Sequence, residues 1–159
     1  MKNLISKKSA EKYFENLKKE NIKLVFTNGC FDILHVGHVR YLKEAKKLGD
    51  RLVVGLNSDT SVKKIKGKKR PIINERERAE ILLSLSCVDF VVIFEEETPY
   101  RLIKKVKPDI LVKGGDWEIE DIVGSKFVQS YGGVVKSISY IEGKSTTGII
   151  ERIEERYGD

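Results

Sequence analysis

The chain of 159 residues carries a formal net charge of +6, is 40% hydrophobic and contains two cysteines, Cys30 and Cys87. Its length fits a single domain, residues 1–159, and no apolar stretch is long enough to span a membrane. Two cysteines outside a Cys-x-x-Cys pair exclude a disulfide framework and indicate no zinc site, so we expect a reduced, cytoplasmic protein.

Hydrophobic periodicity predicts an alternation of helices and strands along the chain. Helices are expected at residues 9–20, 37–48, 75–85, 99–106, 123–131 and 145–156, and strands at 24–26, 51–56, 90–94, 110–112 and 134–138. Because no hairpin signal interrupts the alternation, we expect an α/β fold: a Rossmann-like, doubly wound, parallel five-stranded sheet with helices on both faces. Ligands of such sheets bind beyond the carboxyl ends of the strands.

The segment after the first predicted strand has the strongest functional signal. Both histidines of the chain, His35 and His38, flank Gly37 in a His-x-Gly-His pattern that follows the turn Asn28-Gly29. A strand, a turn and a helix in this order direct free N–H groups and the positive helix end to one point. The pattern predicts a phosphate or nucleotide site. A turn glycine between two unrelated histidines is the alternative.

The second predicted strand is followed by the basic run Lys63–Arg70, which we interpret as a mobile loop covering a polyphosphate. A solvated loop and an RNA-binding surface are the alternatives, and the run lacks interleaved aromatic residues for base stacking. In the helix after it, Arg78 is expected to contact a phosphate, with a partner carboxylate as the alternative.

Two further segments are expected near the same edge of the sheet. Lys113-Gly114-Gly115-Asp116-Trp117 follows the fourth predicted strand, where two glycines permit close approach and Asp116 offers an acceptor to a base amine or ribose hydroxyl. Trp117 is expected to pack against a base, with a structural role in the core or at the surface as the alternative. For the two glycines the alternative is an ordinary turn. The three hydroxyls of Ser145-Thr146-Thr147 precede the last helix and favour phosphate binding there.

Thr27-Asn28-Gly29-Cys30-Phe31-Asp32 with His35-Val36-Gly37-His38 resembles the signature of the nucleotidyltransferases that include the cytidylyltransferases. Class I aminoacyl-tRNA synthetases share the histidine pattern, but their Lys-Met-Ser-Lys-Ser motif is absent here. The chain also contains Lys66-Gly67, Arg70-Pro71, Val88-Asp89, Lys113–Asp116 and Ser145–Thr147 in order. Over residues 23–153 it is similar to the D-glycero-β-D-manno-heptose 1-phosphate adenylyltransferases.

This resemblance implies transfer of AMP from ATP to the heptose 1-phosphate, giving ADP-heptose and pyrophosphate for the lipopolysaccharide inner core. Residues 1–22 would form an N-terminal helical extension and residues 23–153 the catalytic core. Mg²⁺ is expected to arrive bound to ATP, with no metal ligands from the protein. Many members carry a sugar kinase before this domain. None precedes it in this sequence, so a separate heptose kinase is expected, with a homodimer possible and neither stable nucleic acid nor membrane as partner.

The expected site residues fall into three groups. The catalytic residues would be His35, His38 and Lys66. The nucleotide would be bound by Asn28, Gly29, Cys30, Phe31, Gly37, Arg78, Gly114, Asp116, Ser145, Thr146 and Thr147. The acceptor substrate would be bound by Asp32, Asn57, Lys113 and Trp117. Two other functions stay open: a glycerol-3-phosphate-type cytidylyltransferase and a non-catalytic nucleotide- or RNA-binding module.

Overall fold

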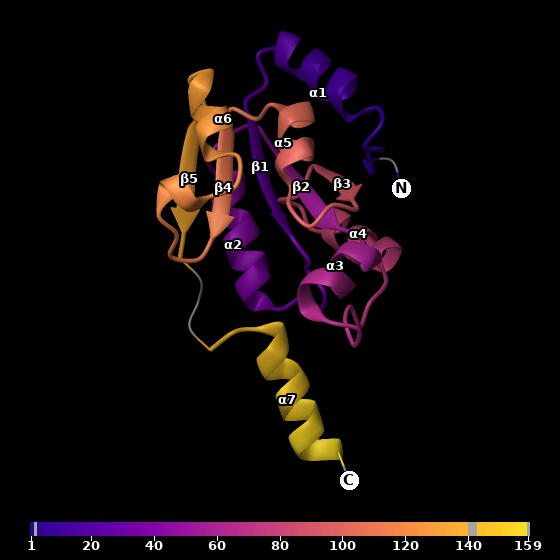
Figure 1. Ribbon diagram of the computed structural model, residues 1–159. Helices are drawn as coiled ribbons and strands as arrows, with labels where there is room; N and C mark the ends of the chain where they lie inside the picture. Colours follow the sequence, from indigo (N-terminus) through magenta and orange to yellow (C-terminus); the bar gives the residue numbers. More distant parts are fainter. Residues whose placement is uncertain (2, 140–142, 159) are drawn as a thin grey trace.

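A computed structural model describes residues 1, 3–139 and 143–158 of the chain (Figure 1). Five parallel strands form one sheet in the order β3-β2-β1-β4-β5. The strands are β1 (Leu24–Gly29), β2 (Arg51–Asn57), β3 (Phe90–Phe94), β4 (Ile110–Gly114) and β5 (Val134–Ile138). The helices are α1 (Ala10–Lys19), α2 (Val36–Lys46), α3 (Asp59–Lys66), α4 (Glu75–Leu83), α5 (Tyr100–Val106), α6 (Ser125–Ser130) and α7 (Thr146–Tyr157), with a 3-10 turn, η1 (Ile119–Asp121).

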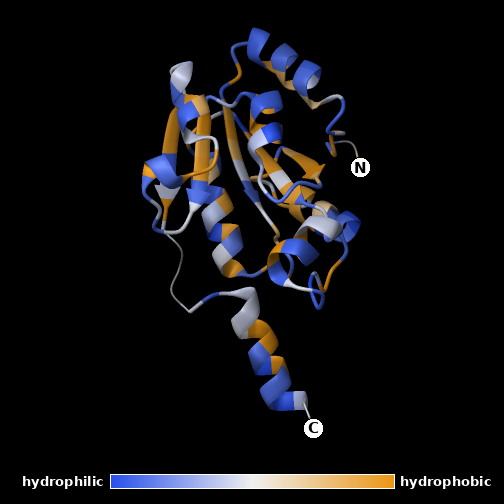
Figure 2. Ribbon diagram, viewed as in Figure 1, coloured by the Kyte–Doolittle hydropathy of each residue, from blue (hydrophilic) through white to orange (hydrophobic). Residues whose placement is uncertain are grey.

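Helices cover both faces of the sheet, as expected for a doubly wound fold. On one face, α1, α5 and α6 pack on a cluster that contains Phe26 and Leu111. On the other, α2 and α4 pack on a cluster that contains Val25 and Val112. Because both faces are covered, the strands are nearly continuous in apolar residues (Figure 2). The sequence prediction of a Rossmann-like sheet is confirmed.

The strand order reverses between β1 and β4, and the two strands separate there. β1 pairs with β2 along its whole length, from Leu24 to Gly29. Its pairing with β4 is confined to Val25 with Ile110 and Phe26 with Leu111. Beyond these pairs the carboxyl ends of β1 and β4 diverge, which opens a crevice at the position where doubly wound sheets bind ligands.

The basic segment differs from its prediction, because residues 59–66 form helix α3 and not a loop. The Ser58 side chain caps its start by accepting the Ser61 N–H, and Val62 is buried against the sheet. Gly67, with φ +96°, ends the helix directly after Lys66. Lys66 is therefore the last residue of a helix and not part of a loop.

Other boundaries also differ from the predictions. The helix expected at 123–131 begins only at Ser125, after Gly124 at φ +88°. The N-terminal extension is more than a helix: Ile5 donates its N–H to Val91 of β3, which covers that edge of the sheet. Helix α7 extends from the body (Figure 1). The structure describes all of its residues, and none of them is buried. Among the described residues no helix is long and apolar enough to cross a membrane.

Candidate active site

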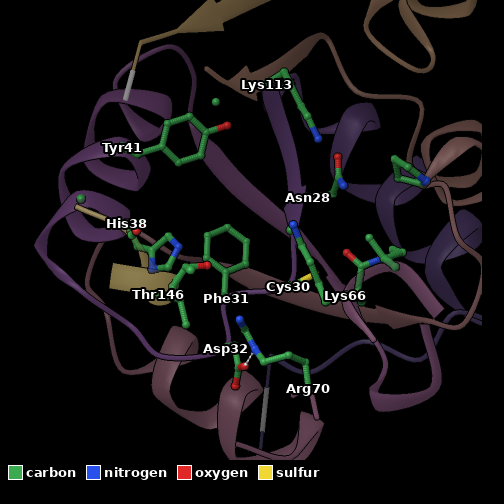
Figure 3. A pocket seen from close by; sticks show the side chains of 18 of the residues that line it. Asn28, Cys30, Phe31, Asp32, His38, Tyr41, Lys66, Arg70, Lys113 and Thr146 are labelled. Carbon is green, nitrogen blue, oxygen red and sulfur yellow. Dashed lines mark hydrogen bonds and ion pairs between the residues drawn. The ribbon is translucent and has the colours of Figure 1, made fainter. Parts of the chain in front are cut away.

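A cavity of about 530 Å³ lies at the carboxyl ends of the strands and is lined from five parts of the chain (Figure 3). Most of the predicted site residues line it together. They are Asn28, Gly29, Cys30, Phe31, Asp32, His35, Gly37, His38, Asn57, Lys66, Lys113, Gly114, Ser145, Thr146 and Thr147. The fold therefore brings together, in one site, segments that are more than 110 residues apart in the sequence.

The two histidines form a stacked pair at the start of α2. His35 is the N-cap residue, and its Nδ1 accepts the Gly37 N–H at 3.1 Å. The proton of the neutral His35 ring is therefore on Nε2. The rings of His35 and His38 are 3.8 Å apart between centroids and 21° from parallel, and Phe31 packs edge-on against His38.

Both rings are neutral at pH 7 in the free protein. Burial lowers the pKa of His38 to about 4, with a smaller contribution from His35. Burial and the nearby Lys144 lower the pKa of His35 as well. A buried imidazole loses the hydration that stabilises its charged form, and stacked imidazolium rings would repel each other. The pair thus offers N–H donors to a ligand without carrying charge.

The N-termini of α2 and α7 converge on the histidine pair. A Cβ at Gly37 would be 2.9 Å from the His35 ring and 3.2 Å from the Lys144 Cβ, so any larger residue would displace the ring or the start of α7. Ser145 caps α7 by accepting the Gly148 N–H, and the Thr146 hydroxyl donates to the Ile33 carbonyl oxygen at 3.3 Å. Two positive helix ends at one point favour an anion with several charges.

Asp32 lines the cavity, but its carboxylate is taken up by the protein. Its oxygens accept the Arg70 Nε–H at 2.5 Å and the backbone N–H groups of Ile72 and Ile73 at 2.8 and 3.0 Å. Burial opposes ionisation, but these bonds outweigh it and lower the pKa of Asp32. Asp32 therefore fixes residues 70–73 to the β1–α2 turn. The substrate contact expected from the sequence stays a prediction, since these oxygens already accept bonds from the protein.

Arg78, in contrast, does not line the cavity. It is 1% exposed, and its guanidinium donates to the carbonyl oxygens of Cys30, Asn57 and Ile73 and to the Asp59 carboxylate, the last at 2.8 Å. The expected phosphate contact is wrong, and the alternative of a partner carboxylate is correct. Arg78 joins the β1 turn to α3 and so positions the lining of the cavity.

Two residues after β4 also lie outside the main cavity. Asp116 is exposed and accepts the Ser139 hydroxyl at 2.9 Å, so the expected contact to the nucleoside is not supported. Trp117 is 48% exposed and donates its indole N–H to the Gly114 carbonyl oxygen. Its ring lines a small adjoining cavity of about 90 Å³.

The structure adds residues that were not predicted as site residues. Arg70 and Lys144 line the cavity, each beside a predicted segment, and both bring positive charge. Glu97, Thr98 and Pro99, between β3 and α5, also line it. Their position directly after a strand was the one available signal, because carboxyl ends of parallel strands meet at one edge. Among the residues that the structure describes, no three His, Cys, Asp or Glu side chains are grouped to hold a metal ion.

A family model described as cytidylyltransferase-like matches residues 26–152, from within β1 to within α7. The chain belongs to the cytidylyltransferase-like family. It is a nucleotidyltransferase, in agreement with the histidine signature. The stacked histidines and the two helix starts lie at the switch point between β1 and β4, where doubly wound sheets bind ligands.

Relatives of this cytidylyltransferase-like chain include the bifunctional protein HldE of Pelobacter propionicus. It is 60% identical over 140 residues, which are 88% of this chain and 29% of the relative. The bifunctional protein HldE of Helicobacter pylori is 56% identical over 149 residues, 94% of this chain and 31% of the relative. The chain thus spans less than a third of the length of these relatives.

Two solved structures are similar to it. The lipopolysaccharide core biosynthesis protein from Thermoplasma volcanium is 35% identical, with a TM-score of 0.62 over 77% of this chain and 99% of that one. The pantoate-beta-alanine ligase from Francisella tularensis is 16% identical, with a TM-score of 0.61 over 96% of this chain and 78% of that one. The second likeness shows the shared fold. The first, with the HldE relatives, confirms the family resemblance found in the sequence.

Proposed function

We propose that the chain transfers AMP from ATP to D-glycero-β-D-manno-heptose 1-phosphate, giving ADP-heptose and pyrophosphate. The observation that carries this proposal is the convergence of two helix N-termini on the stacked His35–His38 pair. That arrangement suits a polyphosphate. The similarity to HldE proteins and to a lipopolysaccharide core biosynthesis protein supports the sugar phosphate acceptor and a role in forming the inner core of lipopolysaccharide.

The reaction requires alignment and charge stabilisation more than a protein nucleophile. An oxygen of the sugar phosphate attacks the α-phosphorus of ATP, and a new oxygen–phosphorus bond forms. The bond from the α-phosphorus to the bridging oxygen breaks on the opposite side, and pyrophosphate leaves with that electron pair. His35 and His38 would donate N–H bonds to the phosphates as negative charge develops, and Lys66 would add a positive charge. The hydroxyls of Ser145–Thr147 and the N–H groups at the start of α7 would hold the remaining phosphate oxygens.

Mg²⁺ would enter the site bound to ATP, because the described residues offer no carboxylate cage for it. We also propose that a kinase reaction supplies the heptose 1-phosphate and that the chain acts in the cytoplasm, where ATP and reduced thiols such as Cys30 and Cys87 coexist.

The test is pyrophosphate release in the presence of Mg²⁺, with ATP or CTP offered against heptose 1-phosphate or glycerol 3-phosphate. Turnover with ATP and the heptose phosphate is the expected result. Turnover with CTP and glycerol 3-phosphate would replace the substrates while keeping the chemistry. Absence of turnover in every pairing would contradict the proposal and favour a binding module.

A further inference from the structure

The cavity holds a cationic region, formed by Lys66 and Lys113, apart from the neutral histidine pair. Lys66 is the last residue of α3, and Lys113 is half-buried near the end of β4. Neither amine forms an ion pair among those seen in the described part of the chain. Burial lowers the pKa of Lys113, and the positive charge of Lys66 lowers it further, whereas Cys30 opposes them. Two neighbouring cations without a carboxylate between them are unfavourable unless an anion joins them.

The strand register places this region across the crevice from the histidines. Side chains alternate between the faces of a strand. Leu111 packs in the cluster under α1, α5 and α6, so Lys113 lies on that side, and Asn28 shares the side of Phe26. The histidines belong to α2, which covers the opposite face. Because β1 and β4 stop pairing after Phe26 and Leu111, Asn28 and Lys113 border open space.

The orientation of the side chains agrees with this placement. Figure 3 shows Lys113 and Lys66 entering from different walls, with both amines directed into the cavity and Asn28 beside Lys113. His38 lies on the other side of the same cavity (Figure 3). The Lys113 amine lies 5.8 Å from the centroid of the Trp117 ring, and the Lys113 side chain is partly buried. A partly desolvated amine attracts an anion more strongly than an exposed one does.

A transfer between ATP and a phosphate monoester brings two polyanions into one cavity. The histidines and the two helix ends account for one of them. The second must be held against electrostatic repulsion by cations of its own, and compact ammonium groups suit a phosphate dianion. We propose that Lys113, together with Lys66, binds the phosphate monoester of the acceptor substrate. This assignment rests on the proposed function and makes Lys113 a residue that selects phosphorylated acceptors over water and neutral alcohols.

The first experiment requires no sugar. Calorimetry measures the binding of inorganic phosphate to enzyme saturated with α,β-methylene-ATP, which occupies the nucleotide site without reacting. Lys113→Met is expected to weaken phosphate binding about 10- to 100-fold, the range for a lost bond to a charged group. Lys113→Arg keeps the charge and is expected to retain most of the binding. Lys136→Met is the matched control, because Lys136 is an exposed lysine of the adjacent strand β5 outside the cavity.

The second experiment measures steady-state rates with the acceptor that the wild-type enzyme uses. Lys113→Met is expected to raise KM for the sugar phosphate about 10- to 100-fold and to leave KM for ATP within about twofold. Unchanged phosphate binding in Lys113→Met, or a rise in KM for ATP in place of the acceptor, would overturn the assignment. If the wild type uses no sugar phosphate, the proposed function fails, and the calorimetric result still decides the role of Lys113.

Discussion

His38 is the side chain whose surroundings depart furthest from those of a solvated histidine. It is stacked on His35, its Nδ1 is buried with no hydrogen-bond partner in the described structure, and Phe31 packs on its ring. We expect His38→Ala to lower kcat about 10²- to 10³-fold, the loss found when one preorganised donor to a developing charge is removed. The rate of pyrophosphate release gives kcat, and circular dichroism checks that the variant is folded. Turnover within a few-fold of wild type in a folded variant would remove His38 from the catalytic group.

The same residue predicts an acid-sensitive fold. The pKa of His38 is about 4 in the folded protein and near 6.5 when solvated. As the pH falls, the unfolded chain therefore binds a proton first, which favours unfolding. Full stability is expected above pH 6.5, with a decline toward pH 4 of at most about 1.4 kcal/mol per pH unit from this residue.

Urea unfolding at pH 7, 6 and 5 measures this decline. His38→Phe is the comparison, because phenylalanine keeps a ring for packing and does not titrate. Its unfolding free energy is expected to change less with pH than that of the wild type. Parallel pH profiles for the two proteins would show that His38 is solvated in the free enzyme.

The sequence predicted which residues gather at the cavity better than it predicted what each side chain contacts. Gly37 and the histidines are neighbours in the chain, so their spacing already carried the local geometry. Arg78 binds Asp59 and Cys30, and Asp32 binds Arg70, at separations of 19 to 48 residues in the sequence. Only the folded arrangement shows that protein groups, and not a ligand, satisfy these charges.

Helices α2 and α7 meet at a single glycine, which makes their packing testable. Gly37→Ala adds a Cβ 2.9 Å from the His35 ring and 3.2 Å from the Lys144 Cβ. Alanine favours the helix by about 1 kcal/mol over glycine, so α2 is expected to form, whereas the His35 ring and the start of α7 must shift. We expect kcat/KM to fall at least about 100-fold, because displacements of 1 Å have such effects.

Gly49→Ala, at the turn before β2, is the control for a glycine with similar crowding, because its Cβ would approach Val25 and Lys23 away from the cavity. It is expected to reduce stability and to leave kcat/KM of the folded fraction near that of the wild type. Equal losses of kcat/KM in both variants would mean that the junction of α2 and α7 has no special role.

Helix α3 shows where pattern-based prediction fails for an element. Its sequence is rich in lysine and has only Val62 and Ser61 buried, so hydrophobic periodicity is too weak to reveal it. The Ser58 cap and the Gly67 stop were present as local signals. The strongly periodic strands β1 to β4 and helix α2 were predicted within a few residues, because their apolar faces are buried on a large sheet.

The topology of the molecule explains why one site could be predicted from scattered motifs. In a parallel sheet every strand ends at the same edge, so Asn28, Lys113 and the residues after them must lie near one another. The order β3-β2-β1-β4-β5 then selects the β1–β4 crevice among the positions along that edge. The place of α7 did not follow from this rule, because no strand pairing fixes a helix after the last strand.

Helix α7 connects the site to the outside of the molecule and gives a prediction for the whole chain. None of its residues, all of which the structure describes, is buried, and Ile149, Ile150 and Ile153 lie on a helix that projects from the body (Figure 2). Its N-terminus nevertheless lines the cavity beside α2. A triphosphate held by both helix ends would join α7 to the sheet, so we expect ATP with Mg²⁺ to slow amide hydrogen exchange in residues 148–153. At 100 times its dissociation constant ATP would also stabilise the fold by about 2.7 kcal/mol.

Hydrogen–deuterium exchange followed by mass spectrometry measures this protection of α7, with His38→Ala as the variant in which protection is expected to weaken. Protection of α2 without any change in α7 would show that the phosphates bind to the histidine helix alone, and the hydroxyls of Ser145–Thr147 would then serve only to cap α7.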